Sequence, residues 1–440
     1  MFPNPQDALP LPARPNLEQY KKQAKDLLRA RKAEDTKVLD AWARRWVLNL
    51  AELSELKVTP GLPVDTRRWV EQVSKFAHDR LATRAKPGLA DAQFVIARCH
   101  GFESWPKFSD HVRALERDWS GVSAFEAAAD AIVVGDLATL QRLLQQETTL
   151  IHARSTREHC ATLLHYVSAN GVEGYRQKTP KNAVEIAAML LSAGAQVDAE
   201  ADVYGGGATT LELAATSVHP ERAGVQEALL ETLLQHGAQL NRSAVAGSNH
   251  LPIVNSCLAN GRLRAAKHLA SRGAALDLEA AAGIGRLDTV KGFFRGGELQ
   301  NATARQRDRG FLWACEYGQI MIAEFLLSNG VDVNTDANTG QTALHCAVIG
   351  GQFETVKLLL ARGASVEEKN IYGGDALGQA LWCALNGDNN IDYAPIIEAL
   401  LDAGAKVGEE SLGWFLSHRA SSSPANQRIV EILRRYLTKS

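Results

Sequence analysis

Short hydrophobic runs that end in glycine recur along the last two thirds of the chain. In the run FETVKLLLARG the apolar residues fall at helical spacing, at Phe353, Val356, Leu359 and Leu360. This spacing is typical of a helix with one buried face. Gly363 ends the run, and glycine readily adopts the left-handed conformation of a helix C-terminus. Similar glycines follow leucine-rich segments at Gly194, Gly237, Gly273, Gly330 and Gly404. The pattern predicts an array of short helices.

The clearest copy of the pattern covers residues 339–370, and Gly330 and Gly363 are 33 residues apart. Thr342 precedes the first helix of this copy, where its hydroxyl can accept a hydrogen bond from a free backbone N–H. His345 follows three residues later, and we expect it to hydrogen-bond across the turn rather than to act in catalysis. Neither helix can bury its apolar face alone, so successive helix pairs must stack.

The segment Thr342-Ala343-Leu344-His345-Cys346-Ala347 resembles the T-P-L-H-x-A signature of the ankyrin repeat. The resemblance runs from about residue 122 to 440 and implies about eight helix pairs, some degenerate, plus a C-terminal capping half-repeat. The number of repeats within 243–305 stays open. We therefore expect an all-α fold, with an ankyrin-repeat solenoid over 121–440 and an N-terminal helical domain over 1–120.

The N-terminal region does not repeat, yet it carries apolar stripes of helical period. The pieces LPARPNLEQYKKQAKDLLRA and LADAQFVIARCHGFESWPKF resemble the N-terminal region of a group of bacterial ankyrin-repeat proteins. That resemblance implies a bacterial origin, and it brings no activity common to the group. We expect this helical domain to dock on the first repeat and cover its open end.

Composition indicates an ordered protein, with 45% hydrophobic and 22% charged residues. A net charge of −2 gives no global reason to expect nucleic acid or an anionic membrane as partner. No apolar run approaches the roughly 20 residues that span a bilayer, and the N-terminus lacks the pattern of a signal peptide. We expect a cytoplasmic location. Six dispersed cysteines without a CxxC pair predict buried reduced thiols, and we expect no metal and no cofactor.

The ankyrin resemblance implies a groove lined by the first helices and the loop tips, with the residues before the inter-helix glycine facing it. Rigid aromatic rings among small polar residues suit recognition of a protein or peptide. The candidates are Tyr166, Asn170, Tyr204, Ser217, Trp313, Glu316, Tyr317, Tyr372 and Trp382. The alternative for Trp313 and Trp382 is that they fill gaps between repeats. The alternative for Tyr204 and Tyr372 is a plain tight turn with an exposed tyrosine.

Three turns between paired helices are longer than the pattern requires. From Gly171 to Leu191 there are 20 residues, against 9 from Gly351 to Leu360. The other two enlarged turns are TSVHPERAGVQ and LNGDNNIDYAP. Because the first two belong to consecutive repeats, we expect them to lie side by side. We also expect residues 170–182, which are polar, to form a local pocket.

Familiar catalytic signatures such as a P-loop, GxSxG or HExxH are absent from the sequence. A histidine beside a carboxylate can nevertheless perform acid–base chemistry, with an arginine holding an anionic or hydroxylated group. The residues that offer this combination are His165, Glu173, Tyr175, Arg176, Glu212 and His219. The alternatives are a hydrogen-bonded network that stiffens the turns and a noncatalytic ligand site. We expect a protein-recognition scaffold first, and an enzyme or receptor for a small polar molecule, such as a sugar or sugar acid, second.

Overall fold

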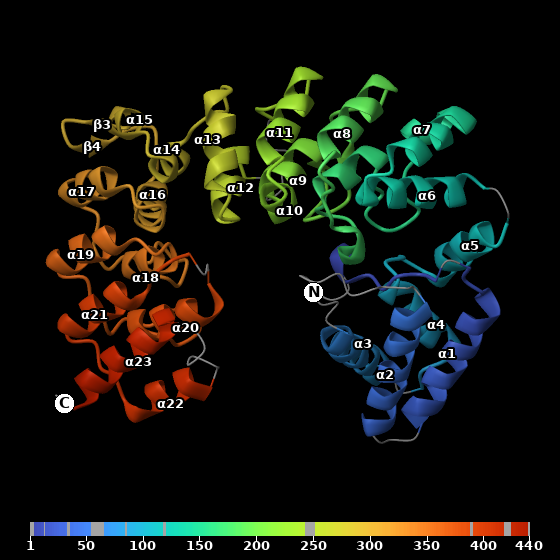
Figure 1. Cartoon of the computed structure of the whole chain (residues 1–440), viewed down its shortest axis with the longest axis horizontal. Coiled ribbons are helices and arrows are strands. Elements are labelled where there is room, and N and C mark those ends of the chain that lie inside the picture. Colours follow the sequence, from blue (N-terminus) through green and yellow to red (C-terminus); the bar gives the residue numbers. More distant parts are fainter. Residues whose placement is uncertain are drawn as a thin grey trace. The chain divides into compact units, whose positions relative to one another are not determined.

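The computed structural model describes residues 4–12, 14–32, 36–53, 66–83, 86–117, 120–242, 251–387, 390–417 and 424–438. The described part of the chain is mostly helical, with two short two-stranded sheets (Figure 1), which confirms the all-α fold class. It separates into two compact units, residues 1–256 and 257–440. Helix α12 (Ile253–Ala259) contains this division. The boundary expected near residue 120 lies inside the first unit, and a separate N-terminal domain stays a prediction.

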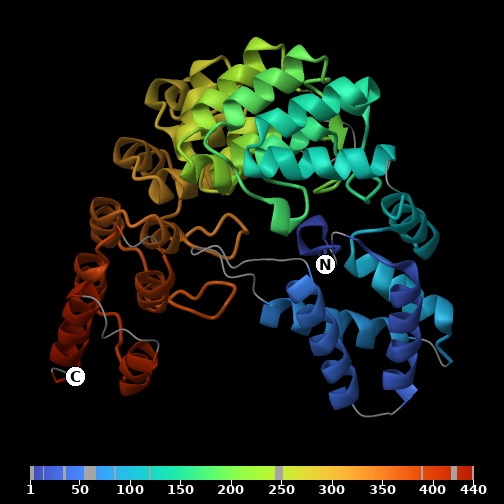
Figure 2. The ribbon, with the colours of Figure 1, turned by 45° about the vertical axis from the view of Figure 1, so that its right-hand side comes forward.

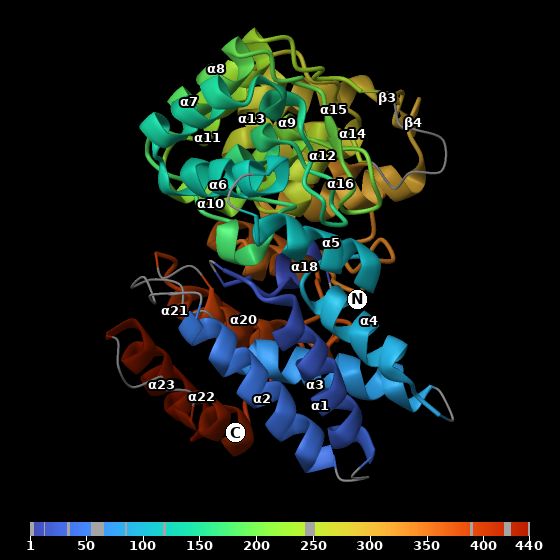
Figure 3. The ribbon, with the colours of Figure 1, turned by 90° about the vertical axis from the view of Figure 1, so that its right-hand side faces the viewer.

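The first unit begins with a closed bundle of four helices. They are α1 (Leu17–Lys32), α2 (Thr36–Leu53), α3 (Thr66–Ala82) and α4 (Leu89–Cys99). Each contacts the next, and α4 contacts α1 (Figure 3). Aromatic rings fill the interior: the ring of His100 stacks on Phe108 and meets the edge of Tyr20. Before α1, the short helix η1 (Pro5–Asp7) leads to Leu9, whose N–H donates to the Cys99 carbonyl at 2.7 Å.

Helix α5 (Trp105–Leu115) connects the bundle to three helix pairs of the first unit. The pairs are α6 (Gly121–Val134) with α7 (Leu137–Gln146), η3 (Leu163–Ser168) with α8 (Ala183–Ser192), and α9 (Thr210–Thr216) with α11 (Gln226–Gln235). Helix α6 packs on η3, η3 on α9, and α8 on α11. The connections contain η2 (Thr148–His152), η4 (Gly174–Arg176), α10 (Val218–Arg222) and the antiparallel strands β1 (Glu200–Ala201) and β2 (Ala208–Thr209). The first two enlarged turns therefore hold η4 and α10.

The second unit is itself a stack of helix pairs (Figure 2). The first helices of its pairs contact one another in succession. They are α14 (Leu278–Ile284), α16 (Ala304–Glu316), α18 (Ala343–Ile349), α20 (Ala376–Asn386) and α22 (Glu409–Ser417). The second helices, also in contact one after another, are α15 (Leu287–Gly292), α17 (Ile320–Ser328), α19 (Phe353–Ala361), α21 (Ala394–Asp402) and α23 (Pro424–Leu437). The expected half-repeat is thus a full pair, α22 with α23.

The stretch 243–305 holds two further pairs, α12 with α13 (Leu263–Ser271) and α14 with α15. After α15 the chain forms a short antiparallel hairpin of β3 (Phe294–Arg295) and β4 (Glu298–Leu299). Residues 243–250 lie outside the described part. In the part that is described, nine helix pairs can be counted, close to the number expected from the sequence.

The clearest repeat shows how one pair is fixed to the next. Thr342 Oγ1 lies 2.8 Å from His345 Nδ1, and His345 Nε2 lies 3.2 Å from the Gly374 carbonyl oxygen of the next repeat. Thr342 therefore bonds to the imidazole and does not cap a backbone N–H, which corrects its expected role. The bridging role expected of His345 is confirmed. Gly363 has a φ of 85°, so the left-handed end of α19 is confirmed as well.

The packing inside this repeat follows the predicted stripe. Val356 and Leu359 are fully buried, while Phe353 and Leu360 pack partly buried against the same core. Five of the six cysteines are buried and Cys160 is exposed. The expectation of buried thiols is therefore correct except at Cys160.

Candidate functional site

The enlarged turn between η3 and α8 carries a buried network of charged side chains. The Glu173 side chain is 0% exposed and that of Arg157 2%, and Arg157 Nε lies 2.9 Å from Glu173 Oε1. Arg176 Nη1 donates to Glu126 Oε2 at 2.8 Å, and Arg176 Nη2 lies 2.7 Å from an Asp130 oxygen. Arg157 also forms an ion pair with Glu126. Two arginines therefore tie α6 of the first repeat to the turn of the second.

The acids of this network are held in their ionised form. Burial alone would raise the pKa of Glu126, but Arg157 and Arg176 outweigh burial and lower it to about 2. The same balance lowers the pKa of Glu173 well below its usual value. Carboxylates that are paired and permanently ionised are poor proton acceptors near neutral pH. Their arrangement favours the alternative of a network that stiffens the turn, while the pocket expected at 170–182 stays a prediction.

The N-terminal segment lies against this turn and against the loop tip of the next repeat. Helix η1 contacts η4, and a Cβ at Gly174 would stand 2.4 Å from the Gln6 carbonyl oxygen. Gln6 Nε2 donates to the Tyr204 hydroxyl at 3.0 Å, and that hydroxyl donates to Asn170 Oδ1 at 2.7 Å. The N-terminal segment therefore bonds to Tyr204, which is still 59% exposed, and Tyr204 bonds in turn to the half-buried Asn170.

A second set of contacts ties the bundle to the loop before η3. The Glu158 N–H donates to the Gly101 carbonyl at 3.0 Å, and Arg98 forms an ion pair with the Glu158 carboxylate. His111 Nδ1 lies 2.6 Å from Thr156 Oγ1. Helix α5 also packs on α6. The helical bundle thus docks on the first repeat, as expected, and on the loop of the second repeat as well.

Other recognition candidates of the first unit are closed to a ligand. Tyr166 is fully buried and Ser217 is 3% exposed, so the exposure expected of both is wrong. The Tyr166 ring meets the edge of Phe125 at a centroid distance of 6.0 Å. Ser217 donates its hydroxyl to the Ala169 carbonyl at 3.4 Å. This bond joins the two enlarged turns, which lie together as expected.

The acid–base candidates do not assemble into one site. His165 is fully buried and lies 2.8 Å from Thr162 Oγ1, the pairing that is typical of this repeat. The histidine that reaches Glu173 is His159, whose Nε2 lies 3.4 Å from Oε1. Tyr175 is half-buried and its hydroxyl is 3.5 Å from an Arg157 nitrogen. Tyr175 and Arg176 therefore belong with the buried charge network.

Glu212 and His219 have separate structural environments. The Glu212 carboxylate accepts the Thr209 N–H at 2.9 Å in a capping box and lies 3.1 Å from Arg242 Nη1. Glu212 stands at the position that His165 and His345 hold in their own repeats, and it caps the N-terminus of α9. His219 is half-buried, and burial, with the Arg222 charge as a smaller cause, lowers its pKa.

In the second unit, the residues at the end of α16 are mostly engaged. Trp313 is 9% exposed and the Arg309 guanidinium lies 5.5 Å from its ring centroid, which favours the gap-filling alternative. The Tyr317 hydroxyl donates to the Leu258 carbonyl. Glu316 is half-buried, and burial raises its pKa to about 7.

An open pocket of about 850 Å³ lies between α20, α22 and the loop that precedes α20. Three aromatic side chains that line it are exposed: Tyr372 at 81%, Trp382 at 51% and Trp414 at 38%. Among the described side chains that line it, Glu410 is the one that carries a charge. The structure therefore brings two sequence candidates, Tyr372 and Trp382, into one exposed aromatic site.

Sequence reasoning missed Trp414 and Glu410. The run SLGWFLSHR lacks the repeat signature, so the sequence does not predict it as the first helix of a repeat. One signal was present, because Trp414 follows Trp382 by 32 residues, close to the repeat period. Arg157 and Glu126 were also missed, and no sequence pattern joins residues from such different loops and helices.

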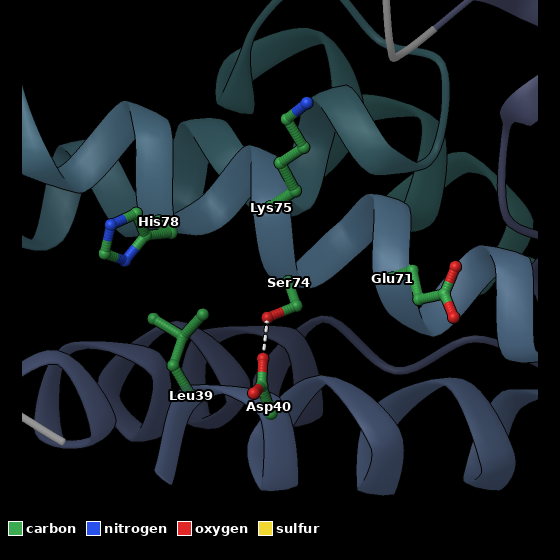
Figure 4. Close-up of a pocket in the computed structure, with 6 residues that line it drawn as sticks. All are labelled: Leu39, Asp40, Glu71, Ser74, Lys75 and His78. Carbon is green, nitrogen blue, oxygen red and sulfur yellow. Dashed lines mark hydrogen bonds between the residues drawn. The ribbon is translucent and has the colours of Figure 1, made fainter. Parts of the chain in front are cut away.

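A smaller pocket of about 330 Å³ lies between α2 and α3 of the bundle (Figure 4). Ser74 Oγ donates to the Asp40 carboxylate, and Lys75, Glu71 and His78 are exposed around it. Serine, histidine and aspartate side chains also form hydrolase triads. Here the hydroxyl donates to the carboxylate instead of to His78, so the required order of contacts is not formed.

Among the described residues, no group of three or more histidine, cysteine, aspartate or glutamate side chains could hold a metal ion. In the same part of the chain, every helix is too short or too polar to cross a membrane.

Comparison with known proteins agrees with this architecture. A family model described as ankyrin repeats in 3 copies matches residues 278–370. The Notch-regulated ankyrin repeat-containing protein of Homo sapiens is 38% identical over 84 residues, which are 18% of this chain and 74% of that protein. Its relative in Danio rerio, protein A, is 34% identical over 109 residues, or 24% of this chain and 95% of that protein. The ankyrin repeat and KH domain-containing protein mask-1 of Caenorhabditis elegans is 27% identical over 219 residues, which are 48% of this chain but 8% of mask-1.

The stacked helix pairs define a helical repeat protein, a class whose members offer extended surfaces for binding. More specifically, this chain belongs to the ankyrin-repeat family. The relatives named above are eukaryotic proteins. The bacterial origin implied by the N-terminal pieces stays a prediction.

Proposed function

We propose that this protein recognises a protein partner through the pocket between α20 and α22. The observation that supports this proposal is the distribution of exposed rings. The exposed aromatic side chains of the described residues are Tyr204, Tyr372, Trp382 and Trp414, and the last three line this pocket. Such rings bury a large area with few torsions to fix, so they serve well as anchors for a partner.

The first unit is a less suitable binding surface for a protein partner than the pocket between α20 and α22. The Tyr204 hydroxyl is engaged by Gln6 of the N-terminal segment, and Tyr166 is buried. A small polar ligand handled by His165, Glu173 and Glu212 is the weaker function, because these side chains have separate structural partners. A cytoplasmic location stays a prediction from the sequence.

The test is a double substitution, Trp382→Ala with Trp414→Ala, in the full chain. Proteins that co-purify with it would be quantified by mass spectrometry, and the strongest partner would be titrated by calorimetry. We expect the partner to be lost, while Met321→Ala, which removes an exposed apolar side chain of α17, should leave it bound. An unchanged partner set with unchanged affinity would contradict the proposal.

A further inference from the structure

We propose that the pocket between α20 and α22 takes an arginine side chain that the partner presents on a peptide segment. This inference rests on the proposed function and specifies the partner's chemistry. It follows from two properties of the pocket: three of its exposed side chains are aromatic, and Glu410 is the charged residue among the described lining residues.

The first property is the set of three exposed rings, Tyr372, Trp382 and Trp414. An aromatic face attracts a cation through its quadrupole. A guanidinium is planar and weakly hydrated, so it stacks on such faces and loses less hydration than an ammonium group. The rings come from two helices and a loop, α20, α22 and the loop before α20.

The second property is the charge of the lining. Glu410 is exposed, and no ion pair holds its carboxylate among the described residues. Among the residues that the structure describes, no lysine or arginine lines the pocket. A basic side chain would therefore meet a complementary charge, whereas an acidic one would meet a like charge.

Two further polar side chains of the wall, Asn370 and Gln379, are already used within the protein. Asn370 Nδ2 donates to Gln379 Oε1 at 3.0 Å, and Gln379 Nε2 lies 3.3 Å from Cys383 Sγ. Asn370 Oδ1 also accepts the N–H groups of Tyr372 and Gly374, each at 3.0 Å. These bonds fix the loop that carries Tyr372. A ligand would thus meet the aromatic rings and Glu410, together with the uncharged side chains of Gln341 and Ser411.

The experiment starts from a phage-displayed library of random dodecapeptides. The library is selected on the full chain and counter-selected on the chain with Trp382→Ala and Trp414→Ala. We expect the enriched peptides to share an arginine. In calorimetry, changing that arginine to citrulline should weaken binding about tenfold, and lysine should bind more weakly than arginine.

A pair of variants on neighbouring carboxylates isolates the charge. Glu410→Gln should weaken the arginine peptide about threefold, while Glu409→Gln, a change at an exposed residue that does not line the pocket, should leave the affinity unchanged. Both variants keep the fold if their thermal midpoints match that of the parent. Equal losses in the two variants would overturn the role assigned to Glu410.

The possible failures can be told apart. Peptides that need the two tryptophans but bind equally with citrulline would overturn the arginine assignment and leave the proposed function standing. Equal binding of lysine would overturn the preference for a guanidinium. A selection without any peptide that depends on Trp382 and Trp414 would overturn the proposed function and this inference together.

Discussion

Arg157 and Arg176 show how single residues give an enlarged turn a structural role. Each is nearly fully buried and each bonds to carboxylates of both α6 and the turn. A buried ion pair adds little net stability compared with apolar packing, but loss of one partner leaves an uncompensated charge. The turn therefore depends on both arginines.

Replacing Arg157 by methionine should lower the free energy of unfolding by about 3 to 5 kcal/mol. The reason is that Glu126 and Glu173 would share one remaining cation in a dry environment. The measurement is urea unfolding followed by circular dichroism. Arg142→Met, a change at an exposed residue of α7, should stay within about 0.5 kcal/mol. Equal effects of the two changes would contradict a stabilising role for the network.

Glu316 gives the second residue-scale prediction, a dependence of stability on pH. Its pKa is about 7 in the folded chain because of burial, above the unfolded value of about 4.3. The folded state therefore binds more protons between these values, and the contribution of Glu316 to stability falls as the pH rises through this range. The loss is at most about 4 kcal/mol, since one pKa unit is worth about 1.4 kcal/mol.

The check is the thermal midpoint of the parent and of Glu316→Gln, measured at pH 5 and pH 8. The glutamine variant should be more stable than the parent at pH 8, and the gap should shrink at pH 5. A gap that is the same at both pH values would refute this titration. Glu324→Gln, a change at an exposed carboxylate of α17, serves as the control.

At the scale of elements, periodicity predicts the helix pairs well but not which rings stay exposed. Tyr166, Trp313 and Trp382 all lie on first helices of repeats, yet only Trp382 is exposed. Phe125 packs on Tyr166, and Arg309 lies over Trp313. Phe125 belongs to the neighbouring helix α6, and Arg309 lies one helical turn before Trp313 on α16. Whether a ring is covered therefore depends on tertiary packing and cannot be predicted from the hydrophobic period.

Two other elements show the same limit. Helix α2 was not among the predicted helices, although its buried residues Leu39, Trp42, Trp46 and Leu50 follow the helical period. The first helix of the second repeat is a 3-10 helix that ends at Ala169 with a φ of 47°. The enlarged turn that follows imposes this end, and an alanine gives no sequence signal for a left-handed conformation.

Gly174→Ala tests the contact between η1 and η4. The added Cβ would clash with the Gln6 carbonyl, so the N-terminal segment should lift from the turn. Hydrogen exchange should then show faster exchange of the Leu9 amide, which donates to the Cys99 carbonyl. Gly121→Ala, where a Cβ has no atom within 4 Å, is the matched control. An unchanged Leu9 amide would show that the close approach is unimportant.

At the scale of the whole molecule, the repeat array could be predicted and the covering of its first part could not. The periodic glycines and the His345 motif are local signals. The bond between Gln6 and Tyr204 joins residues 198 positions apart, and no local pattern contains such information. The sequence predicts that the N-terminal region covers the open end of the array. In the structure this region also reaches the loops of the second and third repeats.

Stacked repeats contact mainly their neighbours, so damage to one unit should remain local. Tyr166→Ala removes a fully buried ring, and we expect a loss of about 3 to 5 kcal/mol in the first unit. Hydrogen exchange should speed up in α8 and α9 but not in α18 to α21. Tyr204→Ala, at an exposed tyrosine, should change far less. Faster exchange across both units would contradict the nearest-neighbour account.

The exposed indoles also have an optical consequence. Trp42, Trp46 and Trp313 are buried, whereas Trp382 and Trp414 open into the same pocket. A water-soluble quencher such as acrylamide reaches accessible indoles first. Shielding of these two from the quencher would therefore signal an occupied pocket, and the protein could report its own ligand by fluorescence without an attached dye.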